Sequence, residues 1–407
     1  MLNTRLAIIL VTLMLLISCT SMTDIVPAGK DTYLIGGSDA ALNLSSLKVK
    51  LYRRATAFCS TQQKDLFVPV TSSEHTQVSI ATYDLTFRCL SEDDLTPISG
   101  YVRTMPLFDA HNHLQYDESA EVLIKWMDEA GVRRMALIPR HYKDDGRATD
   151  EMALAFAQCF PDRFIAFIGG QRSDLWSPSD WYRDSFIFEA EPRAKSGQYH
   201  GLGEFIILHY GYNKYVSTTS QNNSGDQRLP LTTPLMNHLF ELGQKTGLPL
   251  LIHAEAEPDM SQQMRRILQD WPKTKVIWAH NCGRAPASQV AEFLKEFPQL
   301  TCDLAGMSVP MPNPFGWGTF NTSAGNDYRP NSHVTRIQEN DGTINPSMRD
   351  LFEQFPDRFM IGTDIAHTFQ YSRYKDVIIA FRRLLSQLSP ETARKIGNDN
   401  AERLFGK

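Results

Sequence analysis

The sequence predicts a (β/α)8 barrel preceded by a small α+β domain. From Met105 onward, short strand-like runs alternate with amphipathic stretches, and polar residues recur at the carboxyl ends of the strand-like runs. Strands that alternate with helices form a parallel sheet, and eight such units in about 300 residues close into a barrel. An open, doubly wound sheet is the alternative, but it does not require polar residues at matching ends of eight strands. We therefore expect a barrel over residues 104–407.

The first 31 residues are typical of an export signal and a tether. Arg5 precedes an uncharged apolar run at residues 6–17, which is too short to span a bilayer but fits the hydrophobic region of a signal peptide. The segment Leu16-Ile17-Ser18-Cys19 resembles the lipobox of bacterial lipoproteins, whose peptide is cleaved before an acylated cysteine. The alternative is an ordinary secretory peptide with an accidental cysteine.

The lipobox resemblance implies a signal peptide at residues 1–18, a lipidated Cys19 and a polar tether at residues 19–31. Several acyl chains anchor a protein stably at a membrane surface. Thr20, rather than Asp, follows the cysteine, so the resemblance implies an outer-membrane lipoprotein that faces the periplasm. That compartment is oxidising.

Residues 32–92 are expected to form the small α+β module. It should contain one helix and three strands, at residues 47–63 and at residues 32–36, 67–72 and 78–90. A core of about 60 residues is marginal and benefits from a crosslink. Cys59 on the helix and Cys89 on the last strand are the obvious disulfide pair, with two buried free thiols as the alternative. The six cysteines include no C-x-x-C pair, which excludes a cysteine cage for zinc.

The barrel should be built from eight strands and the helices between them. The expected strands are residues 107–114, 132–139, 164–170, 201–208, 248–255, 275–282, 299–306 and 358–365. The clearest helical patterns are at residues 118–131, 148–160, 287–297 and 348–355. The long connection after the seventh strand is crowded with Pro, Gly and Asn at residues 308–332, and we expect it to form a lid or substrate-binding loop.

Six metal-capable side chains lie near the carboxyl ends of these strands, the end that carries the active site of a barrel. His111 and His113 are two residues apart, so both imidazoles should project from one face of the first strand. Such a pair is weak evidence in a chain with 11 histidines. The complete set is much stronger, because imidazoles and carboxylates together bind zinc and similar divalent metals. Its members are His111, His113, Glu204, His253, His280 and Asp364.

Residues 105–407 resemble the metal-dependent amidohydrolase superfamily, in its amidohydrolase-related branch. The similarity lies in FDAHNHL, GLGE, LLIHAE, WAHNCG, MIGTDIAH and the closing NDNAERLF. It implies that His111, His113 and His253 bind metal and that Asp364 is both a ligand and a proton shuttle. It also implies that His280 binds a second metal or polarises the substrate. The implied cofactor is one or two divalent ions, with zinc expected and manganese or iron as alternatives.

Glu204 and Asp109 are two further acidic residues in these strands. Glu204 corresponds to a bridging ligand in TatD-type nucleases, and the alternative is an acceptor that orients His111 or His113. Asp109 should lie deeper on the same strand and orient a ligand. In the implied hydrolysis, the metal lowers the pKa of water, Asp364 moves the proton, and the metal with His280 stabilises the oxyanion.

Cationic side chains near the same strand ends suggest an anionic small-molecule substrate, because Arg pairs with carboxylate and phosphate. Surface ion pairs with the 46 acidic residues are the alternative. The net charge of −5 gives no reason to expect nucleic acid, and the sequence does not indicate an oligomeric state. The candidates are Arg140, Arg172, His209, Arg284 and His367.

The leading hypothesis is a lipid-anchored hydrolase of a small ester, amide, lactone or phosphoester. A metal-dependent decarboxylase of the same superfamily branch is the nearest alternative, because it would use the same ligands. A non-catalytic binding lipoprotein is a third, and the complete ligand set argues against it.

Overall fold

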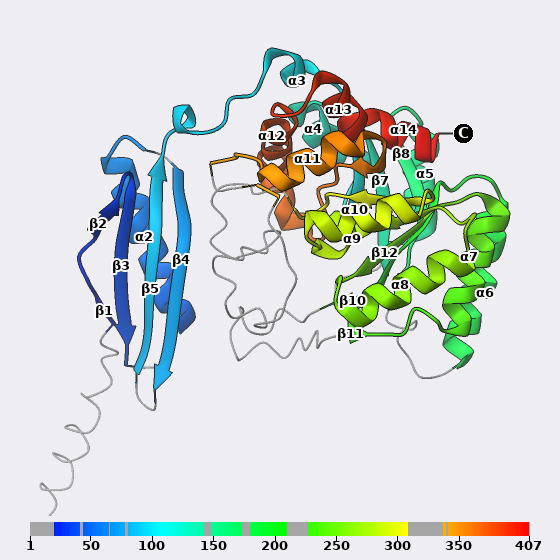
Figure 1. Cartoon of the computed structure of the whole chain (residues 1–407), viewed down its shortest axis with the longest axis horizontal. Coiled ribbons are helices and arrows are strands. Elements are labelled where there is room, and N and C mark those ends of the chain that lie inside the picture. The colour runs from blue at the N-terminus through cyan, green and yellow to red at the C-terminus, as the bar shows by residue number, and fades with distance from the viewer. Residues whose placement is uncertain are drawn as a thin grey trace, which may run out of the picture. The chain divides into compact units, whose positions relative to one another are not determined.

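The computed structural model describes residues 20–40, 44–64, 66–77, 80–141, 148–172, 180–209, 227–307, 337–338 and 341–406. The chain divides into two compact units, Met1–Leu95 and Thr96–Lys407 (Figure 1). The signal peptide, Cys19 and the predicted lid at residues 308–332 lie outside the described residues. Within the described residues, every helix is too short or too polar to cross a membrane.

The first unit is an antiparallel sheet covered on one face by a helix (Figure 1). Its strands run in the order β1-β3-β5-β4, and β2 pairs with β3. Leu47, Leu51 and Ala55, one helical turn apart, pack against the sheet residues Ile35 and Leu85. The elements are β1 (Thr20–Met22), β2 (Val26–Gly29), β3 (Thr32–Asp39), α2 (Leu44–Thr61), β4 (Leu66–Gln77) and β5 (Ile80–Leu90).

Residues 20–29 correct the expected tether. Thr20–Met22 and Val26–Gly29 are strands that pair antiparallel with β3, so this segment belongs to the first unit. Strands of three and four residues are too short to show periodicity, and the pairing partner that makes them strands lies farther along the chain.

The Cys59–Cys89 prediction is confirmed. The disulfide joins α2 to β5, with the two Cα atoms 5.1 Å apart. Both cysteines are buried in the core of the unit.

The second unit is the predicted (β/α)8 barrel, and all eight predicted strands are present. The strands lie side by side in the parallel order β6-β7-β8-β10-β12-β13-β14-β15. Hydrogen bonds from the Ala110 amide to the Ile361 carbonyl (3.0 Å) and from the Asp364 amide to the His111 carbonyl (2.8 Å) join the last strand to the first. The strands are β6 (Leu107–Leu114), β7 (Val132–His141), β8 (Phe164–Ile168), β10 (Gly201–His209), β12 (Leu250–Ala254), β13 (Val276–Trp278), β14 (Leu300–Asp303) and β15 (Phe359–Met360); two short strands, β9 (Gln171–Arg172) and β11 (Gln227–Arg228), lie beside them.

Helices cover the outside of the barrel (Figure 1). Helix α4 illustrates why they form: the Ser119 hydroxyl accepts from the Val122 amide, Leu123 and Met127 are buried, and Gly131 ends the helix in a left-handed conformation. The helices are α3 (Gly100–Thr104), α4 (Ala120–Ala130), α5 (Asp150–Cys159), α6 (Asp180–Lys195), α7 (Pro234–Thr246), α8 (Pro258–Asp270), α9 (Ala279–Arg284), α10 (Ala287–Glu296), α11 (Pro346–Gln354), α12 (Tyr374–Leu385), α13 (Pro390–Arg394) and α14 (Asn400–Phe405).

Candidate metal centre

The six predicted metal ligands come together at the carboxyl ends of the barrel strands. They form two groups, and within each group the potential ligand atoms lie within 4.8 Å of one another. The first group is His111, His113 and Asp364, and the second is Glu204, His253 and His280.

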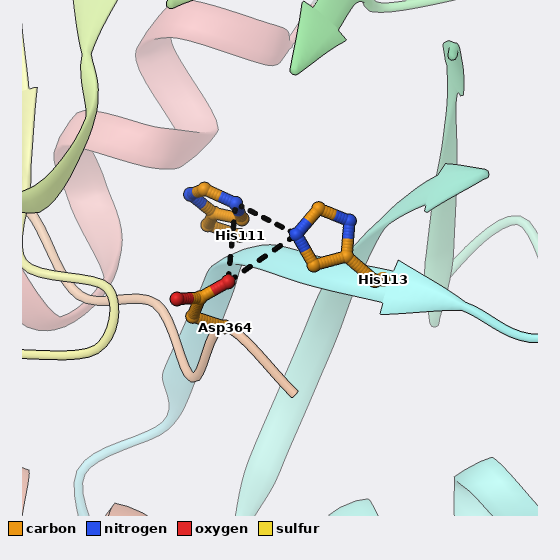
Figure 2. Close-up of side chains that lie close together, drawn as sticks. All are labelled: His111, His113 and Asp364. Atoms are coloured by element: carbon orange, nitrogen blue, oxygen red, sulfur yellow. Dashed lines mark hydrogen bonds and ion pairs between the residues drawn. The ribbon is translucent and has the colours of Figure 1, made fainter. Parts of the chain in front are cut away.

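The first group joins the first and last strands of the barrel. Figure 2 shows the two imidazoles of β6 turned toward the carboxylate of Asp364. The Nε2 atoms of His111 and His113 are 3.3 Å apart. Asp364 Oδ1 lies 3.2 Å from His113 Nε2 and 3.8 Å from His111 Nε2. Three donor atoms therefore converge on one point, as the two-residue spacing on a strand predicts.

The second group is built around the carboxylate of Glu204. His253 Nδ1 lies 3.1 Å from Glu204 Oε1, and His280 Nε2 lies 2.8 Å from His253 Nδ1. Glu204 also faces the first group, because its Oε2 is 3.5 Å from His113 Nε2 and its Oε1 is 3.7 Å from His111 Nε2. This carboxylate thus lies between the two groups.

Three further polar side chains hold the ligands in place, and the sequence analysis did not select them as site residues. Asp303 Oδ2 accepts from His111 Nδ1 (2.9 Å), and its Oδ1 accepts from the His280 amide (3.0 Å). Gln171 donates to Glu204 Oε2, and Glu255 Oε1 lies 3.5 Å from His253 Nε2. Such contacts set the orientation of a ligand and raise its basicity. Asp303 ends β14 and Glu255 directly follows β12, which is the signal that selected the ligands themselves, whereas Gln171 lies three residues after β8.

The backbone at Glu204 departs from regular strand geometry. The pairing of β10 with β12 shifts between Leu202 and Phe205, and such a bulge re-aims a side chain. The Gly203–Glu204 peptide bond is cis. Gly203 has φ +126°, and a Cβ there would lie 2.4 Å from the Leu251 carbonyl oxygen, so only glycine fits.

Asp109 binds Thr363, the residue before Asp364. Asp109 Oδ1 accepts from the Thr363 amide (2.9 Å), and its Oδ2 accepts from the Thr363 hydroxyl (2.7 Å). Asp109 is on β6, and Thr363 lies between β15 and Asp364. These bonds therefore fix the position of the segment after β15 relative to β6. Burial raises the pKa of Asp109 to about 6.

Opposite charges stabilise one another inside this buried cluster. Burial opposes ionisation of Glu204, but His111 and the other imidazoles hold its pKa well below the ordinary value. The pKa of Asp364 is likewise lowered against burial, chiefly by its contact with His113. Burial would lower the pKa of His111, but Asp303 and Glu204 raise it well above the usual value. Burial also opposes the charge on His253, yet Glu204 and Glu255 raise its pKa to about 9.

The donor set fits divalent metal ions. Four imidazoles and two ionised carboxylates point inward, and this mixture of nitrogen and oxygen donors suits zinc, manganese or iron. The facing nitrogen pairs also need a cation between them, since two imidazole lone pairs 2.8–3.3 Å apart otherwise repel or must share a proton. Metal binding would displace the protons that now neutralise the carboxylates.

The amidohydrolase family model matches residues 108–407, which is the whole barrel from its first strand. This chain belongs to the amidohydrolase family. Members of this family are usually metal-dependent enzymes, in agreement with the donor set. A search of curated proteins found no match to the chain.

This amidohydrolase is similar to a number of solved structures, including the following three. An uncharacterised barrel protein from Bordetella bronchiseptica is 14% identical, with 74% of this chain and 98% of that chain covered, at a TM-score of 0.47. A probable 2-pyrone-4,6-dicarboxylic acid hydrolase from Acinetobacter baumannii is 17% identical, with coverages of 74% and 99% and a TM-score of 0.45. A 2,6-dihydroxybenzoate decarboxylase is 15% identical, with coverages of 75% and 100% and a TM-score of 0.39.

Two of the proposed substrate-binding residues of this amidohydrolase lie beside the metal ligands. The Arg140 Nε donates to Gln171 Oε1 (3.1 Å), and Gln171 in turn donates to Glu204. A single side chain therefore separates the Arg140 guanidinium from the Glu204 carboxylate. The His209 ring is 5.1 Å from the ring of His253, and burial with the neighbouring His253 lowers its pKa to about 3.

The other three candidates lie in different surroundings. Arg284 is buried and forms an ion pair with Glu255, next to His253. His367 precedes the 3-10 helix η6 (Thr368–Arg373), where its amide donates to Gln370 Oε1 (2.9 Å) and its carbonyl accepts from the Gln370 amide (2.9 Å). Arg172 is in β9, and its side chain lies outside the described part of the chain.

Proposed function

We propose that this amidohydrolase is a two-metal hydrolase of small esters, amides, lactones or phosphoesters. One observation carries the proposal: Glu204 lies between two groups of ligands, within 3.5–3.7 Å of the first and 3.1 Å of the second. A carboxylate in that position can contact two cations at once, and paired cations stabilise both the attacking and the leaving oxygen of a hydrolysis.

The hydrogen bonds of His280 support a ligand role for this residue. Its Nδ1 lies 2.8 Å from the Ala305 carbonyl, which can only accept, so Nδ1 carries the proton. In the neutral ring, Nε2 then has a free lone pair, and this atom faces Glu204 and His253. His280 is accordingly a ligand to the second metal, whereas an oxyanion donor would need a proton on Nε2.

Asp364 is placed to move the proton. Its side chain is 25% exposed, whereas those of the other five ligands are at most 6% exposed, so it borders the space from which water and substrate arrive. Bound metal supplies Lewis acidity and lowers the pKa of water. The ionised carboxylate of Asp364 accepts the proton of that water and passes it to the leaving group.

Metal analysis tests the two-metal site. We expect two equivalents of zinc, or of manganese or iron, per wild-type chain, and one equivalent or fewer in Glu204→Gln. An exposed matched control is Glu121→Gln on α4, which should keep both metals. A wild-type chain with one metal, or a Glu204→Gln chain with two, would contradict the bridging role.

A substrate panel tests the reaction. Carboxyesters, amides, lactones and phosphoesters should be turned over by the metal-loaded enzyme, with activity lost in Asp364→Asn at unchanged metal content. Arg140 beside the ligands favours substrates with a carboxylate or phosphate, so Arg140→Gln should raise KM about tenfold for these and leave neutral substrates unaffected. Release of carbon dioxide from aromatic acids without hydrolysis of any ester would favour the decarboxylase.

We also propose that Cys19 is acylated and anchors the enzyme to the outer membrane. The lipobox-like segment LISC at residues 16–19 supports this proposal. Wild-type protein expressed in bacteria should fractionate with outer membranes and incorporate labelled palmitate. Cys19→Ser should do neither; labelled Cys19→Ser protein would refute the assignment.

A further inference from the structure

The segment that follows β13 is wound in the left-handed sense. All five residues from His280 to Arg284 have positive φ, between 54° and 75°, and four of the five are not glycine. L-residues disfavour this conformation because Cβ approaches the following carbonyl oxygen. A left-handed turn of this length persists only where the surrounding contacts hold it.

Contacts from two neighbouring strands hold the turn. The Ala256 amide donates to the Gly283 carbonyl (2.9 Å), and the His280 amide donates to Asp303 Oδ1 (3.0 Å). The covalent contact is the disulfide between Cys282 and Cys302, whose Cα atoms are 5.0 Å apart. It ties the centre of the turn to β14.

The turn delivers a metal ligand at its first residue. His280 Nε2 points at Glu204 and His253, whereas Cys282 and Cys302 contribute no atom to either ligand group. Cys282 is two residues from His280, and Cys302 precedes Asp303, whose Oδ1 accepts from the His280 amide, so both ends of the disulfide lead to His280.

The first group of ligands does not depend on the turn. His111 and His113 are on β6, and Asp364 follows β15. Asp303, which orients His111, is on β14, and β14 is paired with β13 on one side and β15 on the other. Cys302 precedes Asp303, but Asp303 is paired with Met360 of β15, so this pairing holds the support of His111 when the disulfide is lost.

We propose that Cys282 and Cys302 are positioning residues for the second metal, which the chain retains only when this disulfide is formed. The inference rests on the proposed two-metal function, and it assigns to this disulfide the control of metal binding at one of the two sites. A disulfide that served stability alone would lower the unfolding temperature without selecting between the two metals.

The test compares wild type with three variants, at a temperature where circular dichroism shows that each protein is folded. Metal content per chain and manganese spin coupling are measured for wild type, Cys282→Ala/Cys302→Ala, His280→Ala and the combined triple variant. The matched control is Cys59→Ala/Cys89→Ala, which removes the disulfide of the first unit. If the double alanine variant does not fold, Cys302→Ala alone opens the bond and keeps the Cys282 sulfur in the turn.

We expect two metals and a spin-coupled pair in wild type and in the control. The Cys282/Cys302 variant should keep one metal tightly and bind the second at least tenfold more weakly, with no coupled signal. The triple variant should match His280→Ala, because the disulfide acts through that residue.

Two metals of wild-type affinity in the Cys282/Cys302 variant would overturn this inference alone. Equal weakening of both metals, or a further loss in the triple variant, would also overturn it. Fewer than two metals in wild type would overturn the proposed two-metal function and, with it, this inference.

Discussion

Asp303 supports a ligand in each of the two groups of the metal centre. One carboxylate oxygen accepts from His111, and the other accepts from the amides of His280 and Ala305. It thereby orients a ligand of the first group and anchors the backbone of a ligand of the second. An asparagine in its place has one acceptor oxygen and must leave part of this set unpaired.

Asp303→Asn should lower metal affinity by about tenfold to a hundredfold, because the support of a ligand is lost while the ligand remains. Competition with a chelator of known affinity measures this. The exposed Asp162→Asn serves as the comparison and should bind metal like wild type. Unchanged metal affinity in Asp303→Asn would show that the Asp303 carboxylate is not needed to orient His111.

Glu118 predicts a pH dependence of stability outside the metal centre. The side chain is 8% exposed, and burial together with Asp117 raises its pKa from 4.5 to about 8, although the Gln115 amide donates to it. The folded chain thus holds a proton that the unfolded chain releases above pH 4.5, so its contribution to stability falls as the pH rises toward 8.

Glu118→Gln removes this dependence, since glutamine does not titrate. The variant should match wild type near pH 4 and become more stable than wild type between pH 5 and 8, by up to about 3 kcal/mol at pH 7. Urea unfolding across this range checks the expectation, with the exposed Glu121→Gln on α4, three residues along the chain, as a control. A constant difference at every pH would contradict it.

At the scale of elements, the barrel closes where β15 and the residues after it approach β6. Gly362 makes this approach possible, because a Cβ at this position would lie 2.6 Å from His111 Cβ and 3.1 Å from Ala305 Cβ. The same contact carries Asp364, two residues later, toward the imidazoles of β6. The contacts that close the barrel therefore also bring together the first ligand group.

Gly362→Ala should lower the free energy of unfolding by about 1–3 kcal/mol, because the added methyl forces the two segments apart. Metal affinity should fall as well, since Asp364 moves with its strand. Gly100→Ala is the control, as a Cβ there meets no atom within 4 Å. Equal stability of both variants would show that the closure is more adaptable than its distances indicate.

At the scale of the whole molecule, the chain combines two compact units with separate cores and separate disulfides. The bond between Cys59 and Cys89 closes a loop with a sequence separation of 30 in the small unit. A crosslink of that span stabilises by about 3–4 kcal/mol in the chain-entropy account. The metal ligands all belong to the large unit.

Cys59→Ala/Cys89→Ala should therefore destabilise the first unit by a few kcal/mol and leave the metal content of the barrel unchanged. Limited proteolysis followed by mass spectrometry checks this, because new cleavage sites should appear only before Leu95. Loss of metal in this variant would show that the small unit supports the site.

The barrel, its eight strands and the six candidate ligands could be predicted from the sequence, because they follow from short-range patterns. A strand needs a run of apolar residues, and a barrel places its active residues at the carboxyl ends of strands. His111, His253 and Asp364 could be selected on that rule with no knowledge of their neighbours. The same rule applies to Asp303, a polar residue at the carboxyl end of the seventh strand.

How these residues are combined depends on contacts between distant parts of the chain. The tertiary structure joins Cys282 to Cys302, winds His280–Arg284 in the left-handed sense, pairs residues 20–29 with β3 and sets Glu204 between two groups of ligands. Each of these depends on a partner distant in sequence or on a backbone conformation that local propensity opposes. Local patterns record what one segment prefers, whereas the pairing of segments is settled by the packing of the whole barrel.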